Sequence, residues 1–178
     1  MITISLDTVA RLLGQTKRHI RRRIAEGSLV KVNYLDAHGR THIPFEAIRT
    51  NIGYTLTAED ISAILEADAG DPLAQHEVAM FFLESGDPER AMDWLHVSAQ
   101  HGCADSMLML GECYLEGLVI SPDWQMGIDW MERAANAGMM LAAETIGSLK
   151  QQLKSIDDAG GHCSETLIVN TLSHSYRS

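Results

Sequence analysis

Residues 102–138 read GCADSMLMLGECYLEGLVISPDWQMGIDWMERAANAG, and this stretch decides the fold because parts of it recur on both sides. Glycines that align with its two ends stand at Gly70, Gly102 and Gly138, which are 32 and 36 residues apart. Small or apolar residues recur four, eight and nine positions after each glycine: Ala74, Ser106 and Ala142; Val78, Leu110 and Ile146; Ala79, Gly111 and Gly147. A repeat of this length predicts stacked helix pairs, in which each pair buries its apolar stripe against its neighbours.

The second half of the unit also repeats. Residues 91–94 (AMDW) parallel residues 127–130 (GIDW), so Trp94 and Trp130 occupy the same position of the repeat. An indole that recurs in this way is typical of core packing rather than of ligand stacking. We therefore expect both tryptophans to be buried.

The pattern resembles the Sel1-like repeat, a relative of the tetratricopeptide repeat, over about residues 70–149. The second copy carries the fullest set of matching residues: Leu110, Gly111, Tyr114, Gly117, Trp130, Ala134 and Ala135. The first copy has a loop trimmed to residues 86–88, and the third keeps only its first helix. The resemblance implies an α-solenoid that serves as a scaffold for binding other proteins.

One face of each first helix is the candidate partner-binding surface. With a turn of 100° per residue, this face lies opposite the small and apolar stripe. It carries Glu77, Met80, Glu84, Leu108, Met109, Glu112 and Glu116, with His76, Leu83 and Leu115 beside them. Exposed Met and Leu ringed by Glu predict a groove for a protein or peptide with basic and apolar anchors. Packing between repeats is the alternative, and it would bury some of these side chains.

The two ends of the sequence differ in charge. The whole chain carries a net charge of -10. Residues 1–50 hold nine Lys and Arg against four Asp and Glu, a balance of +5, whereas residues 51–178 hold five against twenty, a balance of -15. An asymmetry of this size indicates two modules with different partners.

Residues 1–50 predict a compact basic head that begins with two short helices. Apolar residues with helical spacing fill residues 6–13, and Gly14 closes this first helix. Thr16 can cap a second helix, which Gly27 ends. The result is a pair of helices around a tight turn.

A β-hairpin and a last helical turn complete the predicted head. Residues 29–34 and 40–43 alternate around a glycine turn, and Pro44 opens the final helical turn. This order of elements resembles the winged helix-turn-helix head of the excisionase and MerR-type families over residues 3–49. The strings that carry the resemblance are Leu12-Leu13-Gly14, Glu26-Gly27-Ser28-Leu29 and Gly39-Arg40 before Ile43-Pro44. In those families the second helix enters the DNA major groove and the wing contacts the backbone.

The resemblance implies a DNA-contacting face on the second helix and the wing. The residues assigned to it are Thr16, Lys17, Arg18, Arg21, Arg22 and Arg40. The planar forks of Arg18, Arg21 and Arg22 fit guanine edges and phosphates, while Lys17 and Arg40 would neutralise phosphates. A solvated helix face, and binding to RNA or another acidic partner, are the alternatives.

Patterns for catalysis and metal binding are weak. Cys103 stands beside a repeat turn and Cys113 inside a helix, a spacing unlike that of zinc pairs. The sequence has no Gly-rich phosphate loop and no Ser-His-Asp pattern, so we expect no enzyme activity and no cofactor. Three cysteines are too few for a disulfide scaffold. Because the sequence also lacks a run of about 18 apolar residues, we expect a cytoplasmic protein without membrane contact.

These features predict a mainly α protein with a winged helix-turn-helix domain at residues 1–50 and a connector helix at 51–69. A short α-solenoid of Sel1-like helix pairs follows at 70–150, and a C-terminal cap or tail at 151–178. Residues 50–56 carry no clear period and predict either a flexible seam or a head that packs against the repeats. We interpret the chain as a DNA-binding regulator, acting in transcription, whose repeats recruit another protein. The alternative is a pure protein–protein interaction adaptor whose helix-turn-helix is a packing element.

Overall fold

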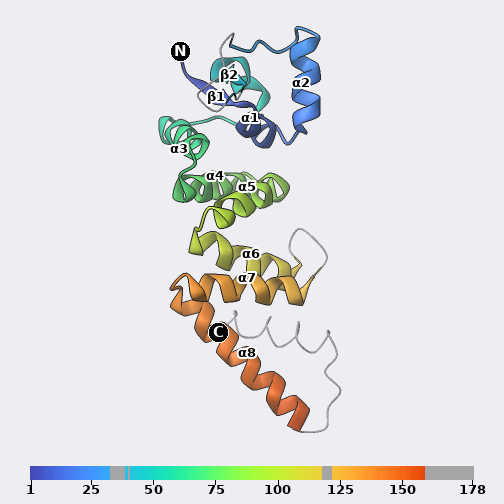
Figure 1. The fold of residues 1–178 in the computed structure, drawn as a ribbon, viewed down its shortest axis with the longest axis vertical. Helices are drawn as coiled ribbons and strands as arrows, with labels where there is room; N and C mark the ends of the chain where they lie inside the picture. Colours follow the sequence, from blue (N-terminus) through green and yellow to red (C-terminus); the bar gives the residue numbers. More distant parts are fainter. Residues whose placement is uncertain (33–38, 40, 118–121, 159–178) are drawn as a thin grey trace. The chain divides into compact units, whose positions relative to one another are not determined.

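The structure, a computed structural model, describes most of the chain: residues 1–32, 39, 41–117 and 122–158. The chain divides into two compact units, Met1–Trp94 and Leu95–Ser178, and we describe each by itself. Apart from one two-stranded sheet, every regular element among the described residues is helical (Figure 1). The predicted mainly α class is therefore confirmed.

The head of the first unit contains two short helices, two strands and two 3-10 turns. Their bounds are β1 Thr3–Ser5, α1 Leu6–Leu12, α2 Lys17–Ala25, β2 His42–Pro44, η1 Phe45–Ala47 and η2 Arg49–Asn51. The hydroxyls of Ser5 and Thr16 each accept a hydrogen bond from the backbone N–H three residues later, which starts α1 and α2. α2 therefore begins directly after its predicted cap Thr16, and α1 begins at the first residue of the predicted helix.

The sheet differs from the predicted hairpin. β2 pairs antiparallel with β1, with Ile4 opposite Ile43, and residues 29–32 belong to no strand. β1 was not predicted because three residues are too few for an alternating pattern to show. Residues 33–38, which include the predicted turn, and Arg40 lie outside the described residues, so the wing stays a prediction.

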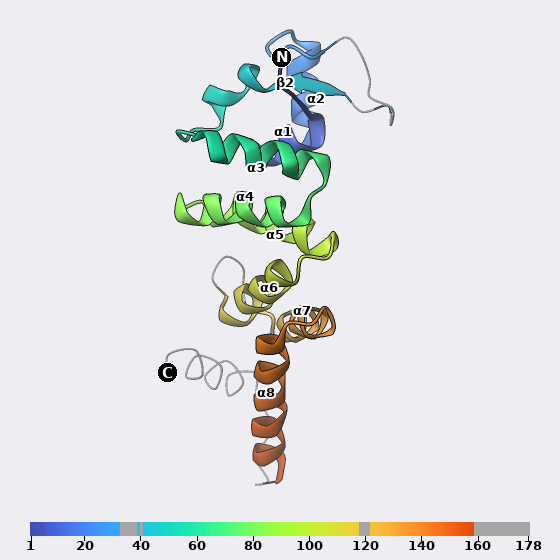
Figure 2. The same ribbon diagram turned by 90° about the vertical axis from the view of Figure 1, so that its left-hand side faces the viewer.

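Three helices complete the first unit: α3 Ala58–Ala69, α4 Pro72–Glu84 and α5 Pro88–Gln100, which crosses into the second unit. α3 begins at a capping box, in which the Thr57 hydroxyl accepts the Asp60 N–H and the Asp60 carboxylate accepts the Thr57 N–H. It ends at Gly70, whose φ of 103° lies in the left-handed region that favours glycine. α3 lies along α4 in both Figure 1 and Figure 2.

The head packs against these helices. The Ser5 N–H donates to the carboxylate of Asp68 on α3, at 3.0 and 3.2 Å from its two oxygens. Ile52 and Leu56, in the segment without a period, are only 1% and 6% exposed. Of the two alternatives for residues 50–56, the structure shows the packed one.

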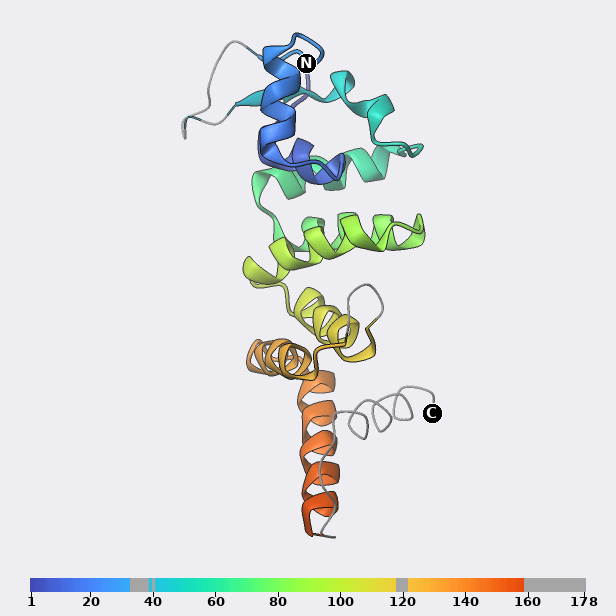
Figure 3. The same cartoon turned by 90° about the vertical axis from the view of Figure 1, so that its right-hand side faces the viewer.

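The second unit contains α6 Ala104–Glu116, α7 Trp124–Asn136 and α8 Met140–Asp158 (Figure 3). α6 and α7 approach closely at Gly111 and Gly127, which have no side chains to keep the helices apart. A Cβ added to Gly127 would lie only 3.1 Å from the Gly111 carbonyl oxygen. Leu115, Met131 and Ile146, one from each helix, form a buried cluster. The three helices thus share one core.

The repeated tryptophans are core residues, as their shared position predicts. Trp94 is 1% exposed and Trp130 is 6% exposed. The rings of His96 and Trp130 meet edge to face, with 5.8 Å between centroids. The Arg133 guanidinium lies 4.5 Å from the centroid of the same indole. Trp130 is therefore held by packing on more than one side.

Candidate functional site

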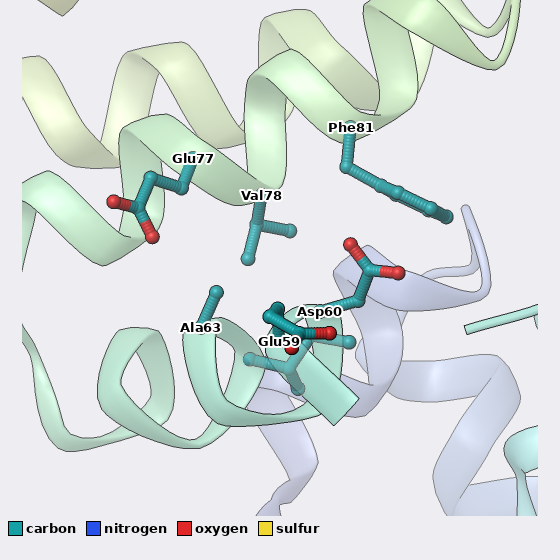
Figure 4. A pocket seen from close by; sticks show the side chains of 7 residues that line it. Glu59, Asp60, Ala63, Glu77, Val78 and Phe81 are labelled. Carbon is teal, nitrogen blue, oxygen red and sulfur yellow. The ribbon is translucent and has the colours of Figure 1, made fainter. Parts of the chain in front are cut away.

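A pocket opens between α3 and α4, inside the first unit. Its volume is about 120 Å³, and its lining is Glu59, Asp60, Ala63, Ile64, Glu77, Val78 and Phe81. In Figure 4, Val78 extends from α4 toward Ala63 of α3, while Glu77 and Phe81 lie on either side of Val78. Ile64 and Val78 are both 2% exposed, so the pocket has an apolar floor beneath an acidic rim.

The rim of the pocket has carboxylates but no cation. Glu59 and Glu77 are exposed, and no described residue forms an ion pair with either of them. The Asp60 carboxylate is held by Thr57, at 2.7 Å from its backbone nitrogen and 2.8 Å from its hydroxyl oxygen. Residues 51–94 contain ten Asp and Glu but a single Lys or Arg, which is Arg90.

Arg90 is fully engaged elsewhere and cannot neutralise the pocket. Its Nε and Nη2 lie 2.7 and 2.6 Å from the Asp87 carboxylate. Its Nη1 donates to the carbonyl oxygens of Leu12 at 2.8 Å and Ile52 at 3.0 Å. The guanidinium also lies 4.7 Å from the centroid of the Phe82 ring. Arg90 therefore ties the head to the helices of the first unit.

The predicted partner residues on α4 lie in different surroundings. Glu77 lines the pocket, whereas Glu84 is exposed and Met80 is half-buried outside the lining. The α3 half of the pocket was not predicted, because residues 51–69 were expected to form only a connector helix. The available signal was the pair Glu59 and Asp60 directly before an apolar helical stripe.

The corresponding face of α6 is partly covered. Its predicted partner residues range from exposed to half-buried: Glu116 is exposed, and Leu108, Met109 and Glu112 are half-buried. Leu115, expected to be exposed beside them, is 1% exposed, so that expectation is wrong. The reason is that Leu115 packs against Gly127 and Met131 of α7 and against Ile146 of α8, and Leu108 packs against the same cluster. Contacts within the α6–α7 pair and with α8 therefore bury part of this face.

Burial also shifts the pKa values of two side chains on α6. Burial raises the pKa of Glu112, and the charge of Glu116 raises it further. Burial, followed by the charges of Glu112 and Glu116, raises the pKa of Cys113 to about 11. A thiol with such a pKa stays protonated at neutral pH, which makes it a poor nucleophile and metal ligand. The described residues contain no group of three or more His, Cys, Asp and Glu suited to hold a metal ion.

The outer face of α2 is cationic. The predicted contact residues at its start and along it are all exposed: Thr16, Lys17, Arg18, Arg21 and Arg22. Two of the cations have carboxylate partners, Lys17 with Asp7 at 2.8 Å and Arg22 with Glu26 at 3.7 Å. Arg18 and Arg21 form no ion pair with any described residue. Arg40, the predicted wing contact, lies outside the described residues.

The comparisons with known proteins concern the helix pairs. The Sel1 repeat family model matches residues 72–103 and 104–139. These segments contain α4 with α5 and α6 with α7, so each match is one helix pair. Residues 72–139 are therefore similar to two successive Sel1 repeats. The chain is also similar to the crystal structure of a Sel1 repeat protein from Oxalobacter formigenes, with a TM-score of 0.50 and 29% identity over 54% of this chain and 75% of that chain. A comparison with curated proteins gives no match.

The pocket lies at the start of the residues that match the Sel1 repeat. The first matched segment begins with α4, so the pocket lies between that segment and the helix before it. α8 continues the pattern, because Ala142 and Ile146 are buried as the repeat predicts. No helix among the described residues has the length and apolarity to cross a membrane.

Proposed function

We propose that this chain is a protein–protein interaction adaptor rather than an enzyme, and that its pocket between α3 and α4 holds a basic anchor of the partner. The observation that carries the proposal is the acid-rimmed apolar pocket beside the first Sel1 repeat. Sel1 repeats are helix-pair scaffolds, and stacked helix pairs present surfaces for binding other chains.

The size and lining of the pocket define the anchor. About 120 Å³ is well below the roughly 300 to 1,000 Å³ of typical small-molecule pockets, so the space suits one side chain better than a cofactor. The aliphatic stem of Lys or Arg would cover Ile64 and Val78 while its cation reaches Glu59 and Glu77. The half-buried Phe81 ring offers a cation–π contact to the same group.

A selection from a displayed random-peptide library tests this proposal with the full chain as bait. We expect enriched peptides with a Lys or Arg next to apolar residues. The Glu59→Gln/Glu77→Gln variant should lose at least about tenfold in affinity for them, since two charge-assisted contacts are weakened. The control Glu89→Gln/Glu144→Gln removes the same charge from exposed positions outside the pocket. Selection of peptides without a basic residue, or equal binding by both double variants, would overturn the proposal.

DNA binding by α2 is the second candidate, and one observation favours it: Arg18 and Arg21 are exposed and form no ion pair with a described residue. Its test is the salt dependence of binding to duplex DNA, with a log-log slope of about -0.9 per phosphate contact. Replacing Arg18 and Arg21 by Ala should reduce affinity and slope, whereas Arg49→Ala, which removes a cation paired with Glu46, should leave both unchanged. Binding that is absent, or identical in both variants, would exclude this role for α2.

A further inference from the structure

We propose that the occupant of the pocket is α2 of a second copy of this chain. The proposal rests on the proposed function, because it names the partner of the same acidic pocket. It joins two surfaces that one copy leaves unmatched: the cationic face of α2 and the acidic rim between α3 and α4.

The charge of the first unit is divided between these two surfaces. Residues 1–50 carry a balance of +5, and residues 51–94 carry ten Asp and Glu against one Arg. That single Arg90 is bound to Asp87, so it leaves the acidic surface without a counter-charge. A ligand that complements this surface must bring several cations close together. The face of α2 has this chemistry.

The spacing on α2 suits a rim with two carboxylates. Arg21 and Arg22 follow Arg18 by three and four residues, which places the Cβ atom of each about 5 to 6 Å from that of Arg18 on one helix face. One arginine can enter between Glu59 and Glu77 while the next remains at the edge. Arginine is the side chain best suited to this role, because its fork binds carboxylates through two parallel hydrogen bonds.

A single copy does not make this contact itself. In the described residues, α2 packs on α1, and no ion pair joins α2 to α3 or α4. The carboxylates that pair with α2 come from the head, Asp7 for Lys17 and Glu26 for Arg22. Each copy therefore exposes both halves of a complementary pair, which another copy can satisfy.

One exposed apolar side chain stands on α4 within a helical turn of the rim residue Glu77. Leu73 is 59% exposed and stands four residues before Glu77, on the same helix face. The methylene stems of arginines can cover such a leucine while their heads reach the carboxylates. Charge and apolar area thus favour the same occupant at the same place.

Sedimentation of the full chain at low and high salt tests the proposal. We expect concentration-dependent self-association at about 20 mM salt that weakens at least roughly tenfold at about 300 mM, because exposed ion pairs are screened. Reciprocal docking would give a closed dimer and one-way docking an open chain. Either assembly supports the proposal, and a monomer at both salt concentrations contradicts it.

Charge reversal makes the test specific. Arg18→Glu/Arg21→Glu reverses the cationic face, and Glu59→Lys/Glu77→Lys reverses the rim. We expect each variant alone to be monomeric, and an equimolar mixture of the two to associate, because the mixture contains opposite charges on facing surfaces. The milder pair Arg18→Gln/Arg21→Gln and Glu59→Gln/Glu77→Gln serves if a reversed variant loses its helical circular dichroism.

The outcomes separate this inference from the proposed function. If the chain stays monomeric but basic peptides still bind Glu59 and Glu77, the pocket serves a foreign partner and this inference is wrong. If neither self-association nor peptide binding occurs, both are wrong. If association survives Arg18→Glu/Arg21→Glu, copies meet through another surface. Duplex DNA binding through Arg18 and Arg21 in a monomeric protein would assign α2 to nucleic acid instead.

Discussion

The guanidinium of Arg90 donates a 2.8 Å hydrogen bond to the carbonyl oxygen of Leu12, which lies 78 residues earlier in the chain. Leu12 is the last residue of α1, so the acceptor is a helix-end carbonyl without an intrahelical partner. The Asp87 carboxylate accepts hydrogen bonds from Nε and Nη2 of the same guanidinium. One side chain of α5 therefore caps the C-terminal end of α1.

Loss of Arg90 should destabilise the first unit. Arg90→Met keeps most of the packing but takes the guanidinium away from the Asp87 carboxylate and the Leu12 carbonyl, at a cost of about 2 to 4 kcal/mol. Urea unfolding would measure this change. Arg49→Met is the matched control, because Arg49 forms a more exposed pair with Glu46 and should cost less than about 1 kcal/mol. Equal stability of the two variants would show that Arg90 does not hold the head in place.

Because of Asp87, the free energy of unfolding should decrease as the pH falls into the acid range. Burial alone would raise the pKa of Asp87, but the hydrogen bonds and charge of Arg90, with a hydrogen bond from Tyr54, lower it below its ordinary value. Because the pKa is lower in the folded state, this stabilisation is complete above the ordinary carboxylate range near pH 4 and is lost as pH falls through the folded value.

Thermal melts between pH 2.5 and 7 would show this dependence. The wild type and Asp87→Asn should differ most at neutral pH and converge at the acid end. Glu46→Gln, at an exposed carboxylate, is the control and should follow the wild type. A difference between wild type and Asp87→Asn that stays constant with pH would contradict the assigned pKa shift.

The helices were predictable because their signals are local. Thr16, Thr57 and Gly70 mark helix ends through hydrogen bonds to nearby backbone or through a left-handed φ, and these effects depend on a few adjacent residues. The repeat period was equally visible, since Trp94 and Trp130 recur with their neighbours. Such features can be recognised in a single sequence without knowledge of the fold.

The pocket and the covered face were not predictable because they depend on which helices pack together. Glu59 and Glu77 are 18 residues apart and line one pocket only because α3 lies along α4. Leu115 looked exposed on an isolated helix, and it is buried because α7 and α8 supply Met131 and Ile146. β1 was missed because its pairing with β2 joins residues about forty positions apart.

Two aligned glycines should respond in opposite ways to alanine. A Cβ on Gly111 would lie 2.6 Å from Cγ of Met131 and 3.1 Å from the Gly127 carbonyl oxygen, so α6 and α7 must separate. A Cβ on Gly147, at the same repeat position in α8, meets nothing within 4 Å among the described residues. We expect Gly111→Ala to cost about 1 to 3 kcal/mol. Gly147→Ala should add about 0.5 to 1 kcal/mol through helix propensity.

Chemical unfolding of the two variants side by side checks this prediction. The same substitution at equivalent positions controls for composition and for repeat register. Stabilisation by Gly111→Ala would mean that the helices can move apart at no cost. Destabilisation by Gly147→Ala would mean that another part of the chain covers α8 at that position.

Trp130 should tolerate phenylalanine far better than alanine. Trp130→Ala removes a ring that contacts His96 and Arg133 and leaves a cavity, at a cost of about 3 to 5 kcal/mol. The Trp130 indole N–H is buried without a hydrogen-bond acceptor among the described residues. Trp130→Phe removes this unsatisfied donor while keeping an aromatic ring, so part of the lost packing is offset and the cost should stay below about 2 kcal/mol.

Met140→Ala, at a side chain 75% exposed, is the control for loss of a large apolar group and should change stability by less than about 0.5 kcal/mol. The measurement is urea unfolding followed by circular dichroism, which does not depend on the replaced chromophore. If Trp130→Ala unfolds at the same urea concentration as the wild type, the ring is not part of the core, and its role as a binding residue must be reconsidered. If alanine and phenylalanine cost the same, the phenyl ring restores none of the lost packing, and the expected tolerance of phenylalanine is wrong.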